Sequence, residues 1–155
     1  MDIIQRLIDD HKSIVKKINQ LPAALLKAKQ NLDLLNALSA EIESDLSVHE
    51  KIEDRLLFPA LRGKIGDPVL QSLVKEHEES KNARELFLSA ILELKKNGGA
   101  SGSPEKIKEM SNHGYKLMRI LSTHLTREDQ LLFPHCKSVL SKEELEKLGE
   151  EARSL

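Results

Sequence analysis

A segment of twelve residues occurs twice in this chain, and the spacing of its polar side chains constrains the fold. Residues 48–59 read VHEKIEDRLLFP and residues 123–134 read THLTREDQLLFP. Each copy places a His four residues before a Glu. Because four residues make roughly 1.1 turns of an α-helix, the two side chains share one helix face. The repeat therefore predicts two equivalent pairs, His49 with Glu53 and His124 with Glu128, in a metal site with internal two-fold symmetry.

The rest of the chain also follows a helical pattern. Gly and Pro are scarce and gather in two segments, 63–68 and 97–104, which are the clearest breaks. Between these breaks apolar residues recur at helical spacing, aromatic residues make up 3% of the chain, and no stretch alternates as a strand does. The fold class predicted is all-α.

Helix start signals and breaks predict the order of the elements. The first helix runs from about residue 2 to 19, the second from Pro22, which starts a helix or kinks the connection, to about 61, and the third from about 68 to 96. The fourth follows Ser103-Pro104, with Pro134 kinking or ending it, and a capping-box pattern at Ser141 predicts a short helix to about Arg153. The result is an antiparallel up-down four-helix bundle with a short C-terminal helix, as a single domain over residues 1–155.

Four histidines are expected at one level of this bundle. In an antiparallel helix pair, residues equally far from the turn lie at the same height. His77 and His124 are symmetric about the Gly-rich segment 97–104, and His49 and His77 are symmetric about Gly63. The turn between the helices of His11 and His49 is placed less securely. His11 and His77 nevertheless each follow a similar segment that ends in an acidic residue. Four His and two carboxylates therefore converge, a set that suits two metal ions.

This ligand chemistry favours iron. Imidazole and carboxylate together suit iron, manganese or zinc, and the absence of Cys ligands disfavours copper(I) and iron–sulfur clusters. Two His for each ion and two bridging carboxylates leave open positions for an oxo or hydroxo bridge and for O₂, NO or peroxide. We therefore expect two bridged iron ions, with zinc or manganese as second choices. The ferritin-like Glu-x-x-His spacing is absent from both copies.

The chain resembles the hemerythrin-like domains, also called HHE cation-binding domains, over nearly its whole length. The resemblance rests on the single His of the first and third helices and on the two His-x-x-x-Glu segments that end in Leu-Phe-Pro. It implies a set of six metal ligands with the two Glu bridging two irons: His11, His49, Glu53, His77, His124 and Glu128. Members of this family bind O₂ reversibly, sense iron or oxygen, or act in nitrosative-stress defence.

One position departs from the oxygen carriers that this family contains. Those proteins have a further His one turn after the ligand of the third helix, and this chain has Lys81 there. The resemblance then implies two His for each metal and a more open centre. Redox or NO chemistry, or sensing, is favoured over oxygen transport.

Simpler interpretations apply to the neighbouring residues. A single core His is usually a hydrogen-bonded structural residue, but burying four His and two Glu without metal would cost several kcal/mol. The Leu-Leu-Phe-Pro segments are expected to serve packing, and Glu50 to be solvated or to support a ligand. Surface charge is the favoured interpretation of the acids beside the ligands, although they are candidates for orienting them: Asp10, Asp54, Glu76 and Asp129.

Composition limits the partners. The net charge of −1 lacks the basic excess that binding to nucleic acid requires. A single cysteine, Cys136, excludes an internal disulfide and favours a reducing compartment. The first residues form neither a signal peptide nor a membrane span, so a cytoplasmic location without membrane association is expected.

The sequence thus predicts a non-haem di-iron protein that binds or reduces O₂, NO or peroxide in a stress response. Two alternatives stay open: an iron or oxygen sensor or metal store that acts through a partner, and a structural zinc bundle. The sequence assigns no catalytic residue and no organic cofactor site. With no flavin or nicotinamide motif, an enzyme of this kind needs an external electron donor.

Overall fold

A computed structural model describes residues 1–96 and 103–155, and nearly all of them are helical. No strand occurs in these residues, apart from an isolated bridge between Arg62 and Ile65. The prediction of an all-α fold is confirmed. The longest elements are α1 (Ile3–Ile18), α3 (Leu32–Ile52), α5 (Asp67–Lys96) and α6 (Pro104–Arg127), and the shorter ones are α2 (Leu21–Leu26), the 3₁₀ turn η1 (Ala28–Gln30), η2 (Glu53–Leu57), α4 (Phe58–Leu61), η4 (Glu128–Leu132), α7 (Phe133–Val139) and α8 (Lys142–Ala152).

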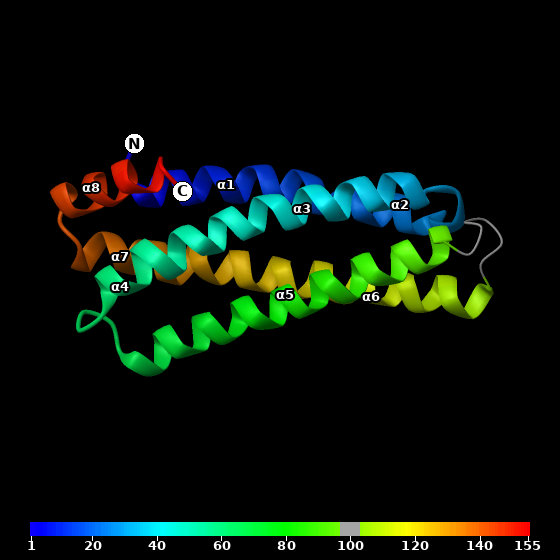
Figure 1. Cartoon of the computed structure of the whole chain (residues 1–155). Coiled ribbons are helices and arrows are strands. Elements are labelled where there is room, and N and C mark those ends of the chain that lie inside the picture. Colours follow the sequence, from blue (N-terminus) through cyan, green and yellow to red (C-terminus); the bar gives the residue numbers. More distant parts are fainter. Residues whose placement is uncertain (97–102) are drawn as a thin grey trace.

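The four long helices lie lengthwise beside one another (Figure 1). Helix α1 contacts α3 and α6, and α5 contacts the same two helices. The four therefore enclose a common interior. Helix α2 packs on α3 and α6 at one end, and α8 packs on α1 and η2 near the other.

Capping side chains precede three of the helices, and the two capping signals predicted from the sequence, at Ser103 and Ser141, are among them. Asp2 Oδ1 accepts a hydrogen bond from the Gln5 backbone N–H at 2.9 Å, and Ser103 Oγ accepts one from the Lys106 N–H at 3.2 Å. Ser141 and Glu144 form the predicted capping box before α8. These side chains satisfy N–H groups that have no partner in the first turn of a helix. The predicted break at 97–104 falls mainly on residues 97–102, which lie outside the described residues.

The single helix expected from Pro22 to about residue 61 is wrong. Helix α2 starts at Leu21, with Pro22 in its first turn, and ends before Lys27, whose φ of −124° and ψ of 52° are not helical. Asn31 is also non-helical, and its Nδ2 donates to the Ala24 carbonyl at 3.2 Å. This hydrogen bond satisfies a carbonyl at the end of α2 and lets a new helix start at Leu32 without any Gly.

Both Leu-Leu-Phe-Pro segments interrupt the α-helix with one π-helical turn. The turns are η2 and η4, and each starts at the Glu of a His-x-x-x-Glu motif. The Phe58 N–H donates to the Glu53 carbonyl and the Phe133 N–H donates to the Glu128 carbonyl, five residues earlier. Proline follows in both copies and cannot donate a backbone hydrogen bond. Pro134 lies in the first turn of α7, directly after η4. Single π-helical turns within α-helices are frequent at functional sites.

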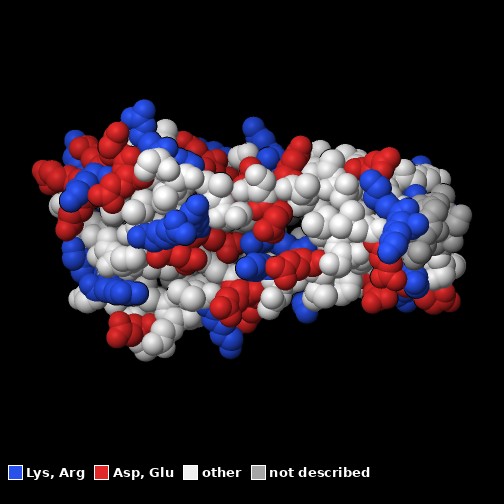
Figure 2. All heavy atoms as spheres, in the orientation of Figure 1, with Lys and Arg blue, Asp and Glu red and all other residues white. Residues whose placement is uncertain are grey.

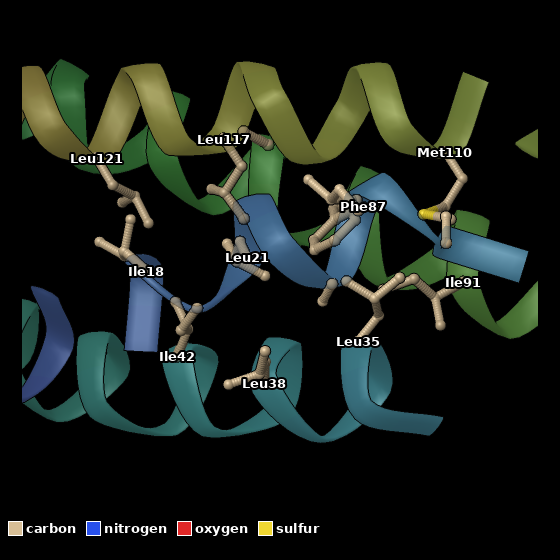
Figure 3. Packing of buried hydrophobic residues seen from close by; sticks show 14 of the residues in the cluster. Ile18, Leu21, Leu35, Leu38, Ile42, Phe87, Ile91, Met110, Leu117 and Leu121 are labelled. Atoms are coloured by element: carbon tan, nitrogen blue, oxygen red, sulfur yellow. The ribbon is translucent and has the colours of Figure 1, made fainter. Parts of the chain in front are cut away.

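Two apolar clusters fill the interior. The larger one joins α1, α2, α3, α5 and α6, and Figure 3 shows residues such as Leu35, Phe87, Ile91 and Leu121 interlocking in it. The smaller one joins the start of α1 to α4, α7 and α8. The His and Glu side chains of the repeat lie along the chain between residues of the two clusters, so the polar site is enclosed by apolar packing.

The outer surface is polar and mixed in charge. Figure 2 shows Lys and Arg interspersed with Asp and Glu over one face of the molecule, as the net charge of −1 suggests. None of the helices in residues 1–96 and 103–155 combines the length and apolar character that spanning a bilayer requires.

Candidate metal centre

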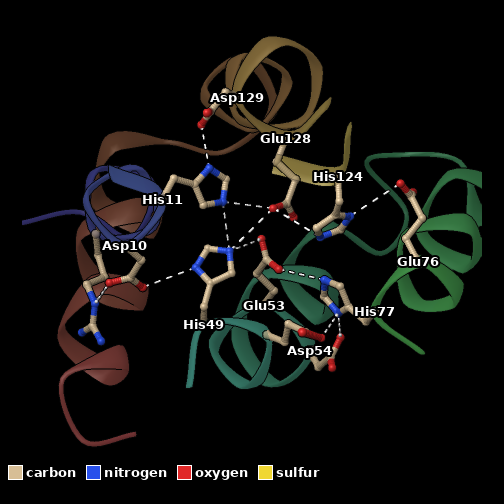
Figure 4. A network of polar contacts seen from close by, with 12 residues as sticks. Asp10, His11, His49, Glu53, Asp54, Glu76, His77, His124, Glu128 and Asp129 are labelled. Atoms are coloured by element: carbon tan, nitrogen blue, oxygen red, sulfur yellow. Dashed lines mark hydrogen bonds and ion pairs between the residues drawn. The ribbon is translucent and has the colours of Figure 1, made fainter. Parts of the chain in front are cut away.

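The structure brings all six predicted residues together in the interior. They come from six different elements, because α1, α3, η2, α5, α6 and η4 each contribute one (Figure 4). Each is at most 4% exposed. The helical spacing of four places each His one turn before its Glu, and the long helices bring the pairs to one level.

Four of the residues form one half of the centre. Their potential ligand atoms lie within 4.8 Å of one another: Glu53, His77, His124 and Glu128. His77 Nε2 is 2.9 Å from Glu53 Oε2, and His124 Nε2 is 3.4 Å from Glu128 Oε1. One cation can therefore contact two imidazoles and two carboxylates here.

The other half contains His11, His49 and again Glu128. The Nε2 atoms of His11 and His49 are 3.1 Å apart, and His11 Nε2 is 3.1 Å from Glu128 Oε1. His49 Nε2 is also 3.5 Å from Glu53 Oε1. Both carboxylates thus lie between the two pairs of His, where each can contact both halves. His11, the residue with the least secure placement from the sequence, is fully part of the cluster.

The polar atoms of the centre lack the partners that burial normally demands. Among the described residues, both carboxylate oxygens of Glu53, Oε2 of Glu128 and the Nε2 atoms of His77 and His124 have no hydrogen bond of acceptable geometry. Buried polar groups without partners are costly and call for an explanation. Imidazole nitrogens and carboxylate oxygens that converge in this way fit cations such as iron, manganese or zinc.

Protons compensate the charges when no cation is bound. Burial opposes protonation of His49, but Glu53, Asp10 and Glu128 outweigh it and hold the pKa of His49 well above its usual range. Burial also opposes protonation of His77, yet Asp54, Glu53 and Glu50 raise its pKa to about 10. The same contacts hold the pKa of Glu53 well below its usual range, against the effect of burial. The centre attracts positive charge strongly.

Comparison with known families agrees with this geometry. The hemerythrin HHE cation-binding domain matches residues 2–136 of the 155. The chain belongs to this family. Membership implies cation binding, and the two His and Glu clusters are where a cation can be held. No curated protein matches the chain.

The structure also places two parts of this hemerythrin-family chain outside the ligand set. Lys81, at the position of the additional His in oxygen carriers, is exposed on the outer side of α5, so four His face the centre among the described residues. Helix α8 lies beyond residue 136, outside the matched region, although it packs on α1 and η2.

Each His of the centre also contacts a carboxylate through its outer nitrogen. The Nδ1 atoms of His11 and His77 lie 2.8 and 3.1 Å from Asp129 and Asp54, and those of His49 and His124 lie 3.4 and 3.5 Å from acids that precede the other two His, Asp10 and Glu76. These contacts agree with the orienting role for which the four acids are candidates, and Asp54 and Asp129 are at the same time exposed, at 45% and 46% of their side chains. The sequence signal that could have revealed these contacts is that the acids recur at equivalent positions. Asp10 and Glu76 each precede a His, and Asp54 and Asp129 each follow a Glu of the centre.

Two expectations about other neighbours can be compared with the structure. Of the two alternatives for Glu50, the solvated one is wrong, because the residue is 8% exposed and pairs with Arg84, and its second oxygen lies 4.0 Å from His77 Nδ1. The two Phe residues of the repeat pack in the core as predicted, but they also contact the candidate ligands. The ring centroid of Phe58 is 5.5 Å from that of His77, and Phe133 is 5.2 Å from His11.

The remaining His and Cys residues are not among the potential ligands that cluster at the centre. His113 is partly exposed and lies 4.0 Å from Glu109, and His135 is exposed. Cys136 is buried, and burial raises the pKa of its thiol to about 12. A thiol with such a pKa is a poor nucleophile.

Proposed function

We propose that this chain holds a non-haem di-iron centre and binds or reduces O₂, NO or peroxide in a cytoplasmic stress response. The proposed ligands are the six residues of the centre, with Glu53 and Glu128 bridging the two ions. The observation that carries the proposal is the position of these two carboxylates between two pairs of imidazole nitrogens. A single cation needs neither the second pair of His nor a second shared carboxylate.

The outer carboxylates support the assignment of the His residues as ligands. A carboxylate near Nδ1 favours the tautomer whose proton is on Nδ1, which leaves the Nε2 lone pair free. In all four His, Nδ1 faces an acid and Nε2 faces the centre. This arrangement matches what a cation at the centre needs from each imidazole.

Iron fits the donor set and the proposed chemistry. Bound at this centre, iron supplies one-electron steps between its ferrous and ferric states. The chain's own residues hold the ions, and the surrounding apolar clusters limit access of water. Reduction of a ligand by the protein would draw on an external electron donor.

The architecture proposed for this function is an antiparallel up-down four-helix bundle. Its four members are α1, α3, α5 and α6, and α8 belongs to the same domain over residues 1–155. The contacts of α1 and α5 with both α3 and α6 support this arrangement. So does the packing of α8 against α1, which carries His11.

Metal analysis by mass spectrometry with an absorption spectrum tests the proposal. The protein is produced in iron-supplemented medium without a metal-affinity tag. We expect about two irons for each chain and near-ultraviolet charge-transfer bands. A His77→Ala variant should lose the bands and at least one of the two irons. His113→Ala, which changes a His outside the centre, is the matched control. A colourless protein that contains only zinc, or no metal, would contradict the di-iron proposal.

A sensor is the second candidate, and α8 favours it. This helix lies outside the family match and packs on two elements that carry proposed ligands, α1 and η2. Metal occupancy could therefore change how firmly α8 is held. Hydrogen–deuterium exchange with and without iron tests this: faster exchange confined to α8 in one state supports a sensor, and identical exchange opposes it.

A further inference from the structure

The two halves of the centre have different surroundings, although their ligands match. Helix α5 matches α1 with an offset of 66 residues, so that His77 corresponds to His11. The second copy of the twelve-residue segment follows the first with an offset of 75 residues. About one and two turns beyond His77 on α5 lie Ser80 and Arg84, and Arg84 pairs with Glu50 of α3. Their counterparts beside His11 are apolar: Ile14, Ile18 and Leu125.

The polar group forms a connected network. Arg84 Nε is 2.5 Å from Glu43 Oε2, and Arg84 Nη1 is 2.5 Å from Glu50 Oε1 and also donates to Ser80 Oγ. The second oxygen of Glu50 is 4.0 Å from His77 Nδ1. Arg84 and Glu50 are 5% and 8% exposed, while the Glu43 side chain is 39% exposed. The network thus leads from the surface to the edge of one half of the centre.

The fold does not require these charges. The apolar counterparts Ile14, Ile18 and Leu125 fill the equivalent space in the other half and are at most 3% exposed. A buried ion pair loses hydration, and apolar residues of similar volume often replace such a pair without loss of stability. We therefore look for the role of the network in what it contacts, which is His77.

Other charges near the centre are balanced between the halves. Arg6 pairs with Asp10 at 3.1 Å, and Arg127 pairs with Glu76 at 2.7 Å. Asp129 and Asp54 face the Nδ1 atoms of His11 and His77 alike. The second carboxylate near the His77 imidazole, that of Glu50, has an apolar counterpart in the other half.

We infer that Arg84 is a positioning residue that holds Glu50 beside His77 and makes the two cation positions of the centre unequal. The inference rests on the proposed function. The additional carboxylate favours a cation at the position of His77 and His124. This position therefore fills first, and the position of His11 and His49 fills second. Arg84 pairs with the other oxygen of Glu50 and offsets part of this charge, so we expect a difference in affinity of about tenfold in a partly screened interior.

Stepwise addition of Fe²⁺ to the metal-free protein without oxygen, followed by calorimetry, tests the inference. We expect two resolved binding steps. His77→Ala should remove the tighter step, and His11→Ala should remove the weaker one. If His77→Ala and His11→Ala remove the steps in the opposite order, the inference is wrong.

Substitutions that copy the other half provide the decisive comparison. In a variant that carries both Glu50→Leu and Arg84→Ile, the two steps should merge into one step of about two ions. Glu50→Gln, which keeps the shape of the side chain and a hydrogen-bond acceptor for Arg84, should reduce the difference in affinity. Glu79→Gln removes an exposed acid from α5, the helix of Arg84, and should leave both binding steps unchanged. Circular dichroism checks that each variant is folded.

The outcomes separate this inference from the proposed function. Two Fe²⁺ ions that bind natural protein with equal affinity would contradict the inference alone, and so would two unchanged steps in both Glu50 variants. If no Fe²⁺ binds, the proposed function fails and the inference fails with it.

Discussion

The Nδ1 atom of His11 lies 2.8 Å from Asp129 Oδ1, although the two residues are 118 positions apart in the chain. The repeat provides the matching contact, in which His77 Nδ1 lies 3.1 Å from Asp54 Oδ1. Each acid directly follows a carboxylate of the centre, and its His partner comes from another helix, α1 for Asp129 and α5 for Asp54. Helix α1 is thus tied to η4, and α5 is tied to η2, so both copies of the repeat contribute to one centre.

Removing one of these acids should weaken metal binding. In Asp129→Asn or Asp54→Asn, the imidazole loses the negative charge that orients it and raises its basicity. We expect roughly a 10- to 100-fold loss of metal affinity, the range found for such outer partners. Calorimetry with Fe²⁺ under exclusion of oxygen measures it. Glu79→Gln, at an exposed position on α5, is the control, and equal losses in all three variants would show that general surface charge is responsible.

Metal should stabilise the fold against heat. The six residues converge only in the folded chain, so a cation that they hold binds the folded state and not the unfolded one. At a free concentration 100 times the Kd the gain is about 2.7 kcal/mol, which corresponds to a rise in Tm of about 5–10 °C for a domain of this size. Thermal unfolding with and without Fe²⁺ checks this. An unchanged Tm at saturating metal would mean that metal binds elsewhere or not at all.

The metal-free protein should lose stability as the pH rises. The pKa of His77 is raised from 6.5 to about 10 in the folded protein, so the folded state binds this proton more tightly than the unfolded state. The resulting stabilisation is fully present below about pH 6.5 and disappears as the pH approaches 10. Thermal unfolding at pH 6, 8 and 9.5 should therefore show a falling Tm.

A variant isolates the contribution of His77 to this dependence. In His77→Gln the group that holds the proton is absent, so the fall in Tm between pH 6.5 and 10 should be smaller. A fall as steep as in the natural protein would show that other groups cause it.

The docking of α8 should depend on Gly149. A Cβ at this position would lie 2.2 Å from the Met1 carbonyl oxygen and 2.9 Å from the Asp2 carbonyl carbon. These backbone atoms cannot move aside without shifting the start of α1, so Gly149→Ala should destabilise the protein by about 1–3 kcal/mol. Unfolding in urea measures the loss. Gly66→Ala, whose Cβ would lie 3.8 Å from Pro68 Cδ, should have a much smaller effect, and equal effects would contradict the packing argument.

Much of the fold could be read from local signals. Ser103 and Ser141 marked two helix starts correctly, because a capping side chain bonds to backbone groups only two or three residues away. The break between α2 and α3 was missed because it contains neither Gly nor Pro. It depends instead on Asn31, which reaches back seven residues to the Ala24 carbonyl.

The sequence by itself determined the helical class and the composition of the centre. Both are periodic properties: apolar spacing sets which face of a helix is buried, and a spacing of four sets His and Glu on one face. The repeat carried this information twice. Only the tertiary structure decided what surrounds the centre. The contacts of His11 with Asp129 and of Glu50 with Arg84 join residues of different helices, and no local spacing encodes them. They arise because burial leaves the outer nitrogen of His11 and the Arg84 guanidinium little water to bond with, so each of these groups bonds to a carboxylate on another helix.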